Sequence, residues 1–66
     1  MNPDIIKTQW SQLSGKLKRK WAKLTDADLN QPKGHREYLV AKLQERYGIA
    51  KEKADMQVKE FERALH

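Results

Sequence analysis

Apolar residues in the first third of the chain recur every three or four positions, and this spacing most constrains the fold. The members of this apolar stripe are Ile6, Trp10, Leu13, Leu17, Trp21 and Leu24. The period is that of one face of an α-helix, and no segment of the chain alternates as a strand does. We therefore predict one helix over about residues 3–23, with Asn2 as its N-cap and Pro3 in its first turn.

Gly15 is the weak point of this predicted helix. At ~100° per residue it falls nearly opposite the apolar stripe, so core packing within this helix does not need a glycine there. Two interpretations stay open. Either the helix tolerates the glycine at about 1 kcal/mol relative to alanine, or Gly15 marks a bend or the close approach of another backbone.

Turn and capping residues divide the rest of the chain into three more helices. Thr25 and Asp28 form a capping-box pattern that starts a short helix over about residues 26–31. Pro32-Lys33-Gly34 then ends it, and a helix over about 35–47 stops at Gly48, a residue suited to left-handed backbone. The last helix covers about 50–64, and its stripe is Ala50, Ala54, Val58, Phe61 and Leu65. The sequence thus predicts an all-α fold of four helices, with Met56 exposed because it lies off the last stripe.

The predicted core is thin, and a few large side chains anchor it. These core anchors are Trp10, Leu17, Trp21, Leu43, Tyr47 and Phe61. Trp10 and Trp21 stand about three helical turns apart, so we expect both on one face and both substantially buried. A base-stacking or ligand-stacking role for the two indoles is the alternative.

The size and composition of the chain exclude several classes of protein. Its 66 residues predict a single domain over 1–66, with little interior to spare for a catalytic cleft. There is no cysteine, hence no disulfide and no thiolate metal site. No apolar run approaches the roughly 18 residues of a membrane span, and the first residues do not resemble a secretory signal. We expect a soluble, cytoplasmic, monomeric protein.

The residues that could carry catalysis do not form a recognisable set. His35 and His66 are the only histidines, and no zinc, calcium or phosphate-loop motif is present. Asp26 and Asp28 fit a helix start better than an acid–base pair. Acidic and basic residues at helical spacing in the last helix, Glu52, Asp55, Lys59 and Arg63, predict a solvated salt-bridge face. We therefore expect no enzyme activity, no metal and no cofactor.

The net charge of +5 lies in the first 24 residues, which hold six basic side chains and one acidic one. Five of the basic residues fall within eight positions: Lys16, Lys18, Arg19, Lys20 and Lys23. They could simply complement the negative end of the helix dipole. Alternatively they form an anion-binding patch for nucleic acid or acidic lipid. Because most of them are lysines, such binding should be weak and non-specific.

Several of these residues, in this order, resemble the CsbD-like family of small bacterial proteins, which includes the YjbJ-type proteins. The resemblance covers about residues 1–61 and rests on Trp10, Gly15-Lys16, Lys18, Trp21, the segment LTDADL at 24–29, Gly34, Leu39 and the segment LQERYG at 43–48. Ala22 and Ala41 stand where the family often has glycine, and both changes favour helix. Arg19 stands where relatives often carry an acidic residue, so a nucleic-acid role does not follow from the family.

The resemblance implies a four-helix fold in which two helical hairpins pack crosswise, similar to SAM-domain-like folds. It also implies induction under general stress in bacteria. It implies no defined biochemical activity. The expectation is therefore a small, non-enzymatic stress-response protein, with weak nucleic-acid or acidic-membrane binding through the basic first helix as the alternative.

Overall fold

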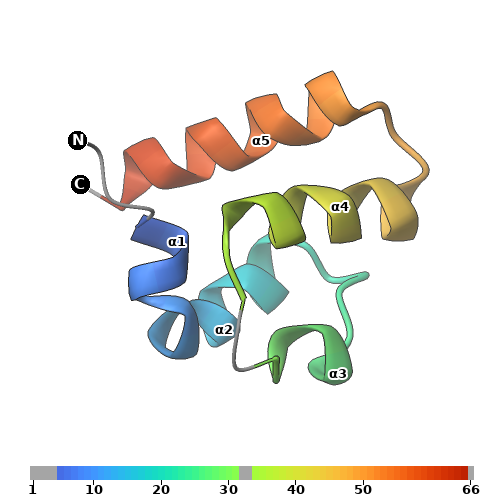
Figure 1. Ribbon diagram of the computed structural model, residues 1–66. Helices are drawn as coiled ribbons and strands as arrows, with labels where there is room; N and C mark the ends of the chain where they lie inside the picture. The colour runs from blue at the N-terminus through green and yellow to red at the C-terminus, as the bar shows by residue number, and fades with distance from the viewer. Residues whose placement is uncertain (1–4, 32–33, 66) are drawn as a thin grey trace.

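The computed structural model describes residues 5–31 and 34–65, and every regular element in these ranges is an α-helix. Over them the chain forms α1 (Ile5–Thr8), α2 (Trp10–Lys20), α3 (Asp26–Leu29), α4 (Arg36–Tyr47) and α5 (Lys51–Ala64). Figure 1 shows α4 and α5 as an antiparallel pair, and α1 also packs against α4. No helix in the described ranges is long and apolar enough to cross a membrane.

The prediction of one continuous first helix is wrong. The helix breaks at Gln9, whose backbone has φ −110° and ψ 18°. The Gln9 carbonyl then accepts bonds from the N–H groups of Gln12 and Leu13, both at 2.9 Å, and α2 begins there. The break changes the direction of the chain between α1 and α2 (Figure 1), while Ile6 and Trp10 both remain in the core. The predicted cap, Asn2-Pro3-Asp4, lies outside the described residues.

The first helix also ends early, at Lys20 instead of Lys23. Trp21 leaves helical geometry at φ −126° and ψ 86°, although its N–H still donates to the Leu17 carbonyl at 2.8 Å. A turn over residues 21–24 follows, closed by the Leu24 N–H and the Trp21 carbonyl at 3.0 Å. This turn buries Trp21 and Leu24 together and leaves Ala22, whose alanine was expected to favour helix, exposed in the turn.

Gly15 causes neither the break at Gln9 nor the early end of α2 at Lys20. It lies in the exposed interior of α2, and a Cβ built on it meets no atom within 4 Å. Among residues 5–31 and 34–65, no backbone outside α2 therefore approaches Gly15, and α2 continues through it without a break. Of the two interpretations, the structure favours a tolerated interior glycine.

The other helix boundaries follow their capping residues. The Asp28 N–H donates to Thr25 Oγ1 and the Thr25 N–H donates to Asp28 Oδ2, both at 3.1 Å, which confirms the capping box. Helix α3 is shorter than predicted and ends at Leu29. Gly48 has φ +62°, and its N–H donates to the Gln44 carbonyl at 2.9 Å, which confirms it as the left-handed end of α4. Ala50 precedes α5 and is exposed, so it does not belong to that helix's buried stripe.

Apolar side chains from all five helices and the 21–24 turn meet in one core. Its buried members are Ile6, Trp10, Leu13, Leu17, Trp21, Leu24, Leu29, Leu39, Val40, Leu43, Ala54, Val58 and Phe61. Tyr47 is half-buried at the edge of this core. Met56, expected to be exposed, is 61% exposed.

Gly34 has a packing role that its place after Pro32 and Lys33 did not suggest. It is buried, and a Cβ at this position would lie 1.9 Å from Cε2 of Trp10. The backbone at residue 34 thus lies directly against the indole. On its other sides the indole meets the ring of Tyr38 edge-on at 5.7 Å and donates from Nε1 to the Leu29 carbonyl at 3.1 Å. A residue with any side chain does not fit at position 34 without moving Trp10.

Candidate anion-binding surface

The basic residues predicted from charge lie along α2 and in the turn that follows it, and all five are exposed. The last turn of α2 holds Lys18, Arg19 and Lys20, where positive charge complements the helix dipole. Successive residues of a helix are ~100° apart, so Lys16 and Lys20 share one flank and Arg19 stands beside them. Lys18 points to the opposite flank, about 160° from Lys16.

Lys20 is held beside a fixed aromatic ring. Its Nζ lies 5.9 Å from the ring centroid of Trp21. The indole itself is anchored on α5, where Nε1 donates to Gln57 Oε1 at 3.0 Å and the ring packs 5.3 Å from that of Phe61. Because the ring cannot move freely, it favours one position of the ammonium group above it.

Lys23 is placed in the same way at the end of α4. Its Nζ lies 5.2 Å from the ring centroid of Tyr47, and its backbone N–H donates to the Tyr47 hydroxyl at 3.2 Å. The sequence predicts both Trp21 and Tyr47 as core anchors, with base or ligand stacking as the alternative for Trp21, and neither prediction includes a contact with a lysine. The platforms they provide for two lysines depend on contacts between distant parts of the chain, and no local pattern signals them.

The five cations differ in whether a carboxylate accompanies them. Lys18 Nζ forms an ion pair with Asp26 Oδ1. Within the described residues, no carboxylate lies within ion-pairing distance of Lys16, Arg19, Lys20 or Lys23. We call these four the basic ridge. The ion pair with Asp26 therefore distinguishes Lys18 from the other four predicted patch residues.

Asp28 is the most perturbed acid, and it is used for structure. It is 4% exposed, and Arg46 holds it with two bonds, Nε to Oδ2 at 2.8 Å and Nη2 to Oδ1 at 2.9 Å. Lys42 Nζ lies 3.6 Å from Oδ1, and the Tyr38 hydroxyl donates to the Asp28 carbonyl at 2.9 Å. The bonds from Arg46, with those from Thr25, hold the pKa of Asp28 well below its usual range despite its burial. We call this contact the α3–α4 clamp.

A second set of ion pairs joins α4 to α5. Arg36 donates from Nη1 to Asp55 Oδ1 at 2.6 Å and from Nε to Glu62 Oε1 at 3.2 Å. The bond from Arg36 lowers the pKa of Asp55. The predicted solvated salt-bridge face of the last helix is therefore wrong for Asp55, because this carboxylate reaches across to α4 instead of along its own helix.

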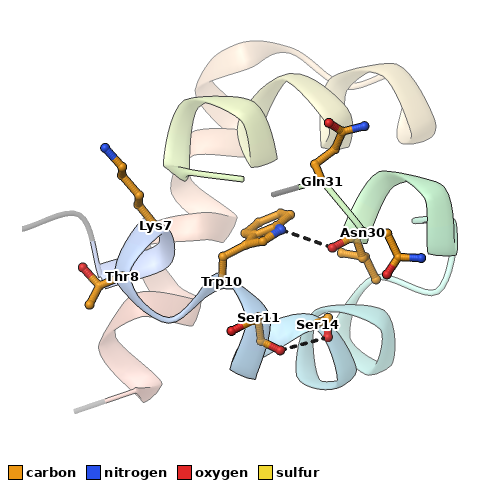
Figure 2. Close-up of a pocket in the computed structure, with 8 residues that line it drawn as sticks. Lys7, Thr8, Trp10, Ser11, Ser14, Asn30 and Gln31 are labelled. Atoms are coloured by element: carbon orange, nitrogen blue, oxygen red, sulfur yellow. Dashed lines mark hydrogen bonds between the residues drawn. The ribbon is translucent and has the colours of Figure 1, made fainter. Parts of the chain in front are cut away.

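The hollow in Figure 2 lies between α2 and the residues after α3 and has a volume of about 340 Å³. Polar groups line it, including the hydroxyls of Ser11 and Ser14 and the amides of Asn30 and Gln31, together with the indole of Trp10. No carboxylate or histidine is among its lining residues, and its one charged lining side chain is that of Lys7.

The structure assigns His35 a packing role. It precedes α4 as its N-cap, and its ring stacks on that of Tyr38 with centroids 6.4 Å apart. No group of three or more potential metal ligands occurs among residues 5–31 and 34–65. His66 lies outside the described residues.

Comparison with known proteins identifies a family across most of the chain. The CsbD-like family model matches residues 4–56. The UPF0337 protein PA4738 of Pseudomonas aeruginosa is 57% identical over 61 residues, which cover 92% of this chain and 94% of that protein. The UPF0337 protein XAC4007 of Xanthomonas axonopodis pv. citri is 49% identical over 65 residues, 98% of this chain and 94% of that one. The UPF0337 protein YjbJ of Salmonella typhimurium is 45% identical over 62 residues, 94% and 89% of the two chains. None of these names states a ligand or a reaction.

Proposed function

This chain belongs to the CsbD-like family, and on that premise we propose that it is a small, non-enzymatic stress-response protein of bacteria. The observation that supports a role without catalysis is the structural ion pair that the buried carboxylate of Asp28 forms with Arg46. A catalytic acid or base must exchange protons near neutral pH and reach a substrate. The Asp28 carboxylate does not exchange a proton near neutral pH, because its pKa is lowered and it stays ionised. It also does not reach a substrate, because it is buried and its oxygens accept hydrogen bonds from Arg46 and Thr25.

Four finer features belong to this proposal. The chain is a single domain over residues 1–66, it is monomeric, and it works in the cytoplasm. Its helices form two hairpins packed crosswise, as in SAM-domain-like folds; the antiparallel pair of α4 and α5 supports the second hairpin (Figure 1). Light scattering of the purified protein should give the mass of one chain of 7.8 kDa.

The stress role is tested by measuring the amount of the protein in its own bacterium. Targeted mass spectrometry is applied to growing cells, to cells after an osmotic upshift and to cells in stationary phase. We expect several-fold more protein in at least one stressed culture. A level that stays constant in both stressed cultures contradicts the stress role.

A second function, anion binding, is supported by the basic ridge. Its four cations have no carboxylate partner in the described residues, whereas four of the eight acidic side chains of residues 25–66 are engaged in ion pairs with cations of α4. An exposed row of unneutralised cations attracts polyanions. We propose that the ridge binds nucleic acid or acidic membrane weakly.

NMR of the ¹⁵N-labelled protein at low salt tests this second function. Duplex DNA, RNA and vesicles with acidic lipid are titrated separately. We expect shifts confined to residues 16–24, together with neighbouring amides of α5. The absence of shifts with all three contradicts anion binding and leaves the stress role untouched.

A further inference from the structure

We propose that the basic ridge binds the phosphate backbone of double-stranded nucleic acid without reading its sequence, and that Asp26 withholds Lys18 from this contact. The proposal rests on the anion-binding function above and names its ligand. The ridge consists of Lys16, Arg19, Lys20 and Lys23, as defined above.

Burial of the apolar face of α2 disfavours a membrane as the partner. Stable attachment to a lipid surface takes apolar anchorage in addition to basic charge. Trp10, Leu13 and Leu17 are each at most 6% exposed, so α2 has no apolar face to insert. In the described part of the chain, Met56 is the one large apolar side chain that is exposed, and it lies on α5.

Burial of the tryptophans disfavours single strands. Proteins that hold single-stranded nucleic acid without sequence preference stack its bases on exposed aromatic rings. Trp10 and Trp21 are 6% and 3% exposed, and Tyr47, the ring beside Lys23, is half-buried at the edge of the core. What remains is a row of point charges, which suits the regular phosphates of a duplex.

The spacing of the ridge fits such a duplex. Lys16 and Lys20 are about 6 Å apart along the axis of α2, with Arg19 between them and Lys23 in the following turn. Duplex DNA carries one charge per about 1.7 Å of its axis, so several phosphates lie within reach of the ridge at once. Lysine contacts phosphate as a point charge, and only Arg19 has the fork that reads a base edge, so no sequence preference follows.

Lys18 stands on the far side of Arg19 from Lys16, about 100° around the helix from the arginine. It could join a duplex centred on Arg19, but it pairs with Asp26. Their side chains are 50% and 76% exposed, so the pair adds little stability. Asp26 nevertheless neutralises Lys18 and places a negative charge near the ligand. Removing the charge of Asp26 should therefore strengthen binding.

The test measures duplex affinity over a series of salt concentrations, by fluorescence anisotropy of a labelled DNA duplex. Each phosphate contact contributes about −0.9 to the log–log salt slope. Four ridge contacts predict a wild-type slope of about −3.6, and Asp26→Asn should steepen it to about −4.5 with tighter binding at low salt. Lys16→Gln with Arg19→Gln should flatten the slope to about −1.8.

Each of these variants has a control that changes the net charge of the protein by the same amount at a site away from the basic ridge. Glu37→Gln matches Asp26→Asn; it lies in the first turn of α4, about 15 Å along that helix from Tyr47. Lys59→Gln with Arg63→Gln matches the double ridge variant. Lys59 lies about 200° around α5 from Gln57, the residue bonded to Trp21. We expect wild-type slopes from both controls, and circular dichroism checks that every variant is folded.

Each other outcome overturns a stated part of the reasoning. Equal effects of Asp26→Asn and Glu37→Gln would mean that only net charge matters, and would overturn the ridge. Tighter binding to single strands than to the duplex, or a difference between two duplex sequences, would overturn the ligand assignment. Binding to acidic vesicles but not to duplex would retain anion binding and reject this proposal, whereas no binding to either would reject both.

Discussion

Asp28→Asn removes the one buried charge in the described part of the chain and keeps the shape of the side chain. Asparagine can still accept the Thr25 N–H through its carbonyl oxygen, so the start of α3 keeps that bond. Arg46, however, loses the carboxylate that takes both of its bonds. The substitution therefore isolates the α3–α4 clamp from the helix cap.

The expected loss is large for so small a protein. Removing one partner of a buried ion pair costs about 3–5 kcal/mol. The side chain of Arg46 is 34% exposed and can turn toward water, so the lower value of about 3 kcal/mol applies. A chain of this length has a total stability of about 3–10 kcal/mol, and Asp28→Asn should leave a measurable fraction unfolded even in buffer.

Urea unfolding followed by tryptophan fluorescence measures this loss. With an m-value of about 1 kcal/mol/M, the midpoint should fall by about 3 M. If the variant is already unfolded in buffer, both proteins are compared in a fixed concentration of sucrose, which stabilises folded states. Asp26→Asn is the matched control, because its exposed pair with Lys18 should change stability by less than about 0.5 kcal/mol. An Asp28→Asn midpoint equal to that of the control would refute the clamp.

The same carboxylate predicts how stability depends on pH. The pKa of Asp28 is lower in the folded protein than in the unfolded chain. Below the unfolded value of about 3.9, the unfolded state binds the proton first and stability is lost. Wild-type stability should thus be complete above about pH 5 and fall as the pH drops through 4, whereas Asp28→Asn should show a shallower fall. Parallel pH profiles would contradict the assignment.

Four further substitutions each test one feature of packing or backbone geometry. Gly34→Ala should destabilise by about 1–3 kcal/mol in urea unfolding, because the new Cβ would overlap Trp10; an unchanged midpoint would contradict the contact. Gly15→Ala should stabilise by about 1 kcal/mol, since its Cβ meets nothing, while Gly48→Ala should destabilise by about 1–2 kcal/mol because of the positive φ. Trp21→Ala should cost about 3–5 kcal/mol, and an unchanged melting temperature would show that the indole does not anchor the core.

Local signals in the sequence predict most of the helices, and tertiary contacts account for the errors. The period of apolar residues and the caps at Thr25 and Gly48 identify the helical segments well. The break at Gln9 has no such signal, because glutamine favours helix and the apolar stripe runs through it. Trp21 also continues the stripe, yet it leaves the helix with its indole bonded to Gln57, 36 residues away. Spacing along the chain contains no information about that partner.

The candidate surface was predictable as a set of charges but not as an arrangement. Counting Lys and Arg finds all five residues of the patch. It does not show that Asp26 pairs with Lys18, eight residues earlier, or that Arg46 bonds to Asp28 across 18 positions. Rules for helical pairs consider only neighbours three or four residues apart. Both pairs join different helices, so they follow from the fold and not from any local pattern.

The ion pairs within the fold explain why the charge of α2 remains available to a partner. Residues 25–66 hold eight basic and eight acidic side chains. Asp28 is bound by Arg46, and Asp55 and Glu62 by Arg36, so these acids tie α3 to α4 and α4 to α5. Acids engaged in this way cannot also neutralise the five basic residues of α2 and the following turn, of which Lys18 alone has a carboxylate partner in the described part of the chain. Because these ion pairs between helices engage the acids, α2 keeps its excess positive charge. We infer that a polyanion from outside the chain supplies the counter-charge.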